Sequence, residues 1–307
     1  MRQQQTLDST ARLRKVVAFY MSGPKYLALK GKTQISYEAH LNKACATRIS
    51  DGRVLGNLSV GEIRVKHLSD CYEKWLLTGV RSANLRMACL SACWKYARQK
   101  DIVESDPISL VDRVPEQPRK VMWERSHVRD FLDVAYSDIK YRSIGLIVHM
   151  AYEWAQRVGD MRLLTWDRLD LDSQRLDLTQ SKRNADVHLP ISDGLCRMLQ
   201  NQKIDFGFQE FVAPKPKPRA GAFVPYDDVE ISTIINAVKD KANVPSGLTA
   251  MDLRRTAVTE MLEGGVDMAG IMQVTGHRNP QSVKPYMINT YRGASAALSK
   301  RGNVDEH

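Results

Sequence analysis

The sequence predicts a mainly α-helical protein with one small three-stranded antiparallel sheet. Three observations indicate this fold class. Apolar residues recur at helical spacing over most of the chain, and the apolar period changes to two between residues 168 and 191. Three prolines interrupt the helical pattern near residue 115. We therefore expect a helical N-terminal domain, a linker and a mixed α+β C-terminal domain.

Size and charge limit the classes of protein that fit. The 307 residues are enough for two domains with ordinary cores, and the hydrophobic (43%) and charged (26%) fractions are those of a globular protein. A net charge of +10 suggests a polyanionic partner, either nucleic acid or an acidic membrane. No apolar run reaches the roughly 18 to 20 residues of a transmembrane helix, and residues 1–15 lack a signal peptide's apolar core. We expect a cytoplasmic protein.

Cysteine usage fits a reducing compartment. None of the five cysteines forms a CxxC pair, so we expect small core residues rather than metal ligands or disulfides. They are Cys45, Cys71, Cys89, Cys93 and Cys196.

Residues 1–112 are predicted to form four or five short helices. One segment places Leu68, Tyr72 and Trp75 on a single helical face. Ser82 is a predicted N-cap for a further helix that ends near Lys100. Because many lysines and arginines lie between the apolar positions, we expect a basic surface on this domain.

A linker is predicted at residues 113–122. Pro107, Pro115 and Pro118 fall close together among charged residues. Since proline lacks an amide donor and disfavours helix in the residue before it, this composition indicates an extended connection.

Residues 123–307 are predicted to form the second domain. Two helical patterns come first. Alternation at Leu169, Leu171, Leu176 and Leu178 then indicates a hairpin, and VHLPI adds a third strand, with Lys182 in the turn before it. Residues 206–225 contain KPKPR, and we expect either a solvated loop or a basic loop beside a phosphate backbone. Helices are expected from 227 to 241 and over most of the remaining chain.

Five side chains in this domain have the chemistry to break a phosphodiester bond. Arginine binds phosphate through paired charge-assisted hydrogen bonds, histidine can donate to phosphate oxygens, and a tyrosine oxygen can act as a nucleophile. Each residue taken alone is better explained as a surface or core residue. The five are Arg157, Lys182, Arg254, His277 and Tyr286.

The order of these five residues along the chain, with the motifs around them, is more informative than any one of them alone. The sequence has QRVGD leading to LLTW, then QSKRNADVHLP, then MDLRRT, then Gly-His, and a tyrosine nine residues after the histidine. In this order and context the chain resembles the tyrosine recombinase (phage integrase) family over nearly its whole length. The resemblance implies a helical core-binding domain at 1–112 that contacts DNA, a linker at 113–122, and a catalytic domain with a C-terminal tail at 123–307.

The resemblance also implies a mechanism for the five residues. Arg157, Arg254 and His277 would stabilise the negative charge of the phosphate, and Tyr286 would attack phosphorus and become joined to the 3′ side of the broken strand. Lys182 would protonate the leaving 5′-oxygen. No metal and no nucleotide cofactor is needed.

The implied partners are double-stranded DNA and further copies of the chain. Family members close around the duplex. Their contacts would be mostly to phosphates, so the affinity for DNA should fall steeply as the salt concentration rises. A homotetramer on two DNA sites, with the tail after Tyr286 exchanged between protomers, follows from the resemblance, as do accessory DNA-bending proteins and a nucleoid-associated location.

One position departs from the family pattern. Met251 stands where the family motif begins with histidine, and methionine neither accepts nor donates a proton at neutral pH. We expect a slowed but functional enzyme. Tyr291 is a rival nucleophile whose spacing is less favourable than that of Tyr286. Arg255 is expected to be a structural or DNA contact, and Asp160 an orienting carboxylate.

Several functions share these residues. Integration and excision of a phage or other mobile element is the function we favour, with chromosome-dimer resolution and transposon movement as alternatives within the family. A type IB topoisomerase and a DNA-binding protein without catalysis are the alternatives outside it.

Overall fold

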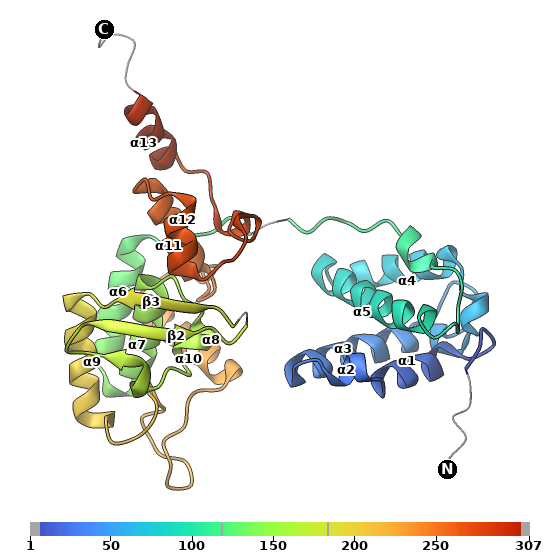
Figure 1. The fold of residues 1–307 in the computed structure, drawn as a ribbon, viewed down its shortest axis with the longest axis horizontal. Coiled ribbons are helices and arrows are strands. Elements are labelled where there is room, and N and C mark those ends of the chain that lie inside the picture. Colours follow the sequence, from blue (N-terminus) through green and yellow to red (C-terminus); the bar gives the residue numbers. More distant parts are fainter. Residues whose placement is uncertain (1–6, 118, 183, 302–307) are drawn as a thin grey trace. The chain divides into compact units, whose positions relative to one another are not determined.

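The protein is described by a computed structural model that covers residues 7–117, 119–182 and 184–301. The chain divides into two compact units, Met1–Gln117 and Pro118–His307 (Figure 1). The described residues are mainly helical, with one small antiparallel sheet in the second unit. This confirms the fold class that the sequence predicts.

The first unit is helical around a single apolar core. Its α-helices are α1 (Leu13–Met21), α2 (Pro24–Leu27), α3 (Gly31–Ala46), α4 (Val65–Leu76) and α5 (Val80–Arg98). Two short 3₁₀ turns, η1 (Leu55–Asn57) and η2 (Val60–Glu62), lie between α3 and α4, and a third, η3 (Pro107–Leu110), follows α5.

The start of α5 differs from the prediction. The helix begins at Val80, so Ser82 is not its N-cap. The residue before the helix is Gly79, which adopts φ +110° and lets the chain reverse directly after α4. The helix therefore starts before Ser82 is reached, and the Ala83 amide donates to the Gly79 carbonyl.

All five cysteines are buried and free. Four of them belong to the core of the first unit and Cys196 to that of the second. Burial raises the pKa of the Cys89 thiol to about 11, which keeps it protonated and unreactive at neutral pH. The structure thus confirms that they are core residues.

Residues 111–117 and 119–124 form no helix or strand, and hydrogen bonds hold both stretches. On one side the Val114 amide donates to the Tyr72 hydroxyl. On the other, Arg119 donates to both carboxylate oxygens of Asp252, and the Trp123 amide donates to the Thr256 hydroxyl. Side-chain anchors therefore replace secondary structure in this proline-rich stretch.

The second unit combines helices with the sheet. Its elements are α6 (Arg125–Tyr136), α7 (Ile139–Glu153), α8 (Val158–Met161), η4 (Trp166–Arg168), β1 (Leu169–Asp170), β2 (Arg175–Thr179), β3 (Asp186–Pro190), α9 (Asp193–Phe206), α10 (Asp228–Lys241), α11 (Asp252–Glu263), α12 (Met268–Thr275), η5 (Pro280–Ser282), η6 (Lys284–Tyr286) and α13 (Tyr291–Arg301).

The sheet has the order β1-β2-β3 and is antiparallel throughout. Leu176 pairs with Leu189 and Leu178 with Val187, and all four side chains are buried. Since side chains alternate between the two faces of a strand, this register turns one face of the hairpin to the core. The predicted three-stranded sheet is confirmed, and Lys182 lies in its second turn.

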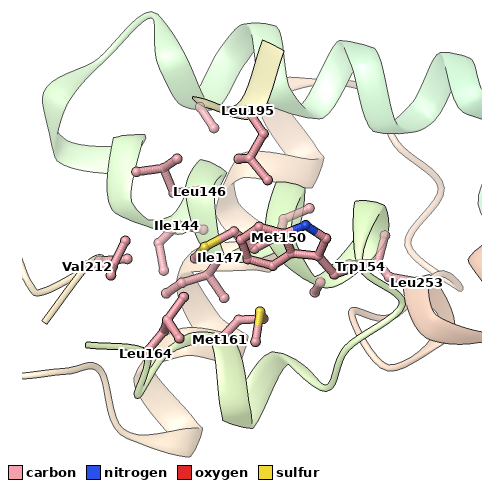
Figure 2. Packing of buried hydrophobic residues seen from close by; sticks show 14 of the residues in the cluster. Ile144, Leu146, Ile147, Met150, Trp154, Met161, Leu164, Leu195, Val212 and Leu253 are labelled. Carbon is pink, nitrogen blue, oxygen red and sulfur yellow. The ribbon is translucent and has the colours of Figure 1, made fainter. Parts of the chain in front are cut away.

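Helix α7 lies at the centre of the second core. Figure 2 shows side chains of other elements, including Met161, Leu195 and Leu253, gathered around Ile147 and Trp154 of this region. The Trp154 indole also donates to the Pro190 carbonyl at the end of β3. This packing ties the chain just before α8 to the sheet.

Residues 207–225 are irregular apart from isolated bridges, and Phe206, where the irregular segment is predicted to begin, is the last residue of α9. Lys215 of this loop pairs with Glu230 at 2.5 Å. A role of the loop at a phosphate backbone stays a proposal. Among the described residues no helix is both long and apolar enough to cross a bilayer.

Candidate active site

Arg157 is placed by the turn between α7 and α8. It is the N-cap residue of α8, with extended backbone (ψ 136°). Its Nη1 donates to the Oε1 atom of Gln180 at 3.0 Å and lies 3.5 Å from the Oδ2 atom of Asp160. The guanidinium is therefore held between an amide and a carboxylate.

Asp160 connects α8 to the turn that carries Lys182. Its Oδ1 accepts hydrogen bonds from the amide (3.2 Å) and the hydroxyl of Ser181. The carboxylate is 5% exposed. It thus orients backbone and an arginine, in agreement with the role expected for it. Lys182 itself is exposed one residue further on.

Arg254 projects from the first turns of α11 and is 3% exposed. Its Nη2 donates to the Thr275 carbonyl oxygen at 2.6 Å. Its guanidinium carbon lies 5.6 Å from the ring centroid of Tyr286, which is within cation–π range. The buried guanidinium and the candidate nucleophile are therefore neighbours.

His277 follows the C-terminus of α12. Gly276 caps that helix in the left-handed conformation (φ 67°, ψ 26°), which favours glycine. The Thr275 hydroxyl donates to the Ile271 carbonyl, and it lies 2.7 Å from His277 Nδ1. Since the hydroxyl carries one hydrogen, Nδ1 is the donor in that contact. The Nε2 atom can then donate to a phosphate when the ring is an imidazolium.

Tyr286 ends η6 and is partly buried. Its ring centroid lies 5.4 Å from that of His277. The Thr259 hydroxyl donates to the Tyr286 carbonyl at 3.2 Å, and Arg255 donates to the Pro285 carbonyl at 3.4 Å. These contacts hold η6 against α11. The rival Tyr291 is 91% exposed at the start of α13.

Met251 is the N-cap residue of α11, and its side chain is 73% exposed. It precedes Arg254 by three residues, so the two lie on neighbouring parts of the helix surface. The departure from the family motif is thus on the helix that carries a candidate arginine.

The structure brings four of the five predicted residues together. Arg254 and His277 contact the Tyr286 ring directly, and Arg157 joins them through Gln180 and Thr275. In the described part of the chain, Lys182 has no hydrogen bond or ion pair to the other four. It is linked to them by the turn that Asp160 anchors.

Sequence reasoning missed Gln180 and Thr275. Both are fully buried polar residues at the junction of the two arginines. Their positions beside Lys182 and Gly276 are the available signal, but a single sequence does not distinguish a buried glutamine from a solvated one. Chemically, two guanidiniums and an imidazole form an anion-binding site beside a phenol that can act as the nucleophile. These are the groups that phosphoryl transfer requires.

Comparison with known proteins agrees with this chemistry. A profile of the phage integrase family matches residues 124–292, more than half of the chain. The chain belongs to the phage integrase family of tyrosine recombinases. It is therefore a member of a family of enzymes that recombine DNA at specific sites.

Individual relatives are distant. The tyrosine recombinase XerC of Bacillus pumilus is 23% identical over 72% of this chain and 73% of its own length. The prophage integrase IntA of Escherichia coli is 22% identical over 75% of this chain and 55% of its own length. A lambda integrase tetramer bound to a Holliday junction has the same fold, with a TM-score of 0.72 at 17% identity, over 94% of this chain and 80% of that one.

Proposed function

We propose that this enzyme cuts and rejoins DNA through a 3′-phosphotyrosyl intermediate at Tyr286. The observation that carries the proposal is the placement of the Tyr286 ring against His277 (5.4 Å) and Arg254 (5.6 Å). A phenol beside a guanidinium and an imidazole is positioned to attack a bound phosphodiester. The same contacts favour Tyr286 over the exposed Tyr291.

The reaction would proceed by a single displacement at phosphorus. Arg157 and Arg254 bind the non-bridging oxygens, and the imidazolium of His277 donates a third hydrogen bond as charge builds up in the transition state. The Tyr286 oxygen bonds to phosphorus, its proton passes to solvent, and the 5′-oxygen leaves with a proton from Lys182. A 5′-hydroxyl from a second DNA strand reverses the step and joins the new strands.

The proposed partners are duplex DNA and three further copies of the chain. The lambda integrase neighbour is a tetramer on a Holliday junction, which supports both. Exchange of the tail would use α13, where Leu298 is 59% exposed. The helical unit would bind DNA as a core-binding domain and residues 123–307 would form the catalytic domain. Accessory DNA-bending proteins and a nucleoid-associated location remain part of this proposal.

Integration and excision of a mobile element is the role we favour. The similarity to a prophage integrase supports it. The similarity to proteins named tyrosine recombinase XerC supports a second candidate, chromosome-dimer resolution by the same chemistry. Direct repeats flanking the gene together with phage-like neighbours would distinguish the first role from the second.

Covalent trapping tests the chemistry. A nicked duplex whose 5′-hydroxyl fragment diffuses away after cleavage would leave the protein attached to DNA. We expect the wild type and Tyr291→Phe to form this adduct, and Tyr286→Phe to form none, while all three bind the same duplex. An adduct with Tyr286→Phe would move the nucleophile elsewhere. Binding without any adduct in the wild type would support the non-catalytic alternative.

A further inference from the structure

Gln180 occupies the junction between the two candidate phosphate-binding arginines. It follows β2, and its side chain is fully buried. Its Oε1 accepts from Arg157 at 3.0 Å. Its Nε2 donates to the Thr275 carbonyl at 2.9 Å and to the Oε1 atom of Gln156 at 2.6 Å. Both the oxygen and the nitrogen of the side-chain amide are therefore hydrogen-bonded.

The Thr275 carbonyl extends this connection to the second arginine. It accepts from Gln180 and also from Arg254 at 2.6 Å. Arg157 and Arg254 are 97 positions apart in sequence, yet two hydrogen-bonded groups, an amide and a carbonyl, span the space between them. A shift of the Gln180 side chain would thus disturb both guanidiniums.

The choice of an amide has a chemical consequence. A carboxylate at this position would also accept from Arg157, but it would neutralise the guanidinium charge that a phosphate requires and would face the Thr275 carbonyl without a donor. Glutamine orients the arginine and leaves its charge available.

The backbone beside Gln180 is shaped to admit it. A Cβ atom on Gly276 would lie 2.9 Å from Gln180 Nε2 and 3.0 Å from its Cδ. The glycine before His277 is therefore required twice, for its left-handed conformation and for the space that the glutamine fills. The link between Gln180 and the loop that carries His277 is direct packing as well as hydrogen bonding.

We propose that Gln180 is the positioning residue that sets the geometry of the phosphate clamp, fixing Arg157 directly and Arg254 through the Thr275 carbonyl. The proposal rests on the proposed function, because the clamp has a role only if a phosphodiester binds there. The hydrogen bonds of Gln180 go to Arg157, Gln156 and Thr275, so it acts through the arginines.

The test uses Gln180→Met in the whole 307-residue chain, which keeps the side-chain volume and removes both kinds of hydrogen bond. Gln202→Met is the matched control. Gln202 is equally buried, accepts from Arg142 at 2.8 Å and donates to the Val212 carbonyl at 3.1 Å, and it touches none of the five site residues. Each variant is assayed for the single-turnover rate of covalent adduct formation.

Two substrates separate positioning from general damage. One carries the ordinary phosphodiester, and the other carries a methylphosphonate at the scissile position, which has one negative charge fewer and depends less on the arginines. We expect Gln180→Met to lower the rate on the phosphodiester about 10²-fold. On the methylphosphonate the loss should be much smaller, as with Arg157→Ala. Gln202→Met should keep the wild-type rate on both.

Three results would overturn the proposal while the wild type remains active. These are a wild-type rate for Gln180→Met, an equal loss on both substrates, or the same loss in Gln202→Met. If Gln180→Met does not fold, Gln180→Glu replaces it, and a wild-type rate on the phosphodiester would equally overturn the proposal. Failure of the wild type to form any adduct would instead overturn the proposed function.

Discussion

Lys182 differs from the other candidate residues because it is exposed while Arg254 and His277 are buried. A proton donor to the leaving group has to reach the 5′-oxygen only when DNA is bound, so an exposed position on a turn suits it. We predict that Lys182→Ala lowers the rate of adduct formation by about 10²–10⁴-fold. A single-turnover cleavage assay measures this.

The leaving group provides the control for Lys182. Sulfur in place of the 5′-oxygen departs as a thiolate without needing a proton. The Lys182→Ala variant should then approach the wild-type rate on the sulfur-containing DNA. A loss of the same size on both substrates would show that Lys182 binds the DNA and does not act as a general acid.

Met251 should limit the rate of the wild-type enzyme. Its side chain is 73% exposed at the start of α11, so an imidazole ring can replace it without entering the core. Since proton transfer by a positioned side chain contributes about 10²–10⁴-fold, we expect Met251→His to speed cleavage toward the lower end of that range. The new rate should follow the protonation of the introduced histidine in a pH profile. Met251→Leu, which adds no titratable group, should match the wild type.

At the scale of elements, the sequence correctly predicted the helices and strands that a local pattern of apolar residues determines. Alternation at Leu176 and Leu178 gave the strand because it reflects burial of one face directly. Ser82 is not the N-cap because Gly79, with φ +110°, is the N-cap residue and the helix begins at Val80. The role of Gln180 was not predicted because its partners, Arg157 and Thr275, become its neighbours only in the folded chain.

Helix α11 is anchored by a buried carboxylate at its first residue. Asp252 is 1% exposed, and accepts from Arg119, Arg255 and Thr249. Burial alone would raise the pKa of Asp252, but the hydrogen bonds from Arg119 and Thr249 outweigh burial and hold this pKa below 3.8. The charged form is therefore favoured by folding, and its position beside the N-terminus of the helix adds to that.

Replacing this carboxylate should destabilise the second unit in a pH-dependent way. We expect Asp252→Asn to lower the free energy of unfolding at pH 7 by about 1.5–3 kcal/mol, since hydrogen bonds to a charged group are lost. A lowered pKa gives stability above the unfolded-state pKa of about 4, and that stability is lost as the pH falls through the folded-state pKa. The difference from wild type should therefore shrink below about pH 4.

Urea unfolding followed by tryptophan fluorescence between neutral and acidic pH measures this difference. Asp177→Asn is the control, because the pKa of Asp177 is also lowered, first by a hydrogen bond with His188, but its side chain is 48% exposed whereas that of Asp252 is buried. That variant should change stability far less. An Asp252→Asn effect that stays constant down to low pH would contradict the assigned ion pairs.

At the scale of the whole molecule, we expect DNA binding and DNA cleavage to respond differently to substitutions. The sequence holds 45 lysines and arginines against 35 acidic residues, and affinity that comes from phosphate contacts falls linearly in log–log form with salt, with a slope of about −0.9 per phosphate neutralised. Tyr286 carries no charge, so Tyr286→Phe should keep the wild-type slope while losing the adduct. Arg157→Ala should reduce the magnitude of the slope by about one contact. Fluorescence anisotropy with a labelled duplex over a range of salt concentrations measures both, and a slope near zero for the wild type would contradict a phosphate-based interface.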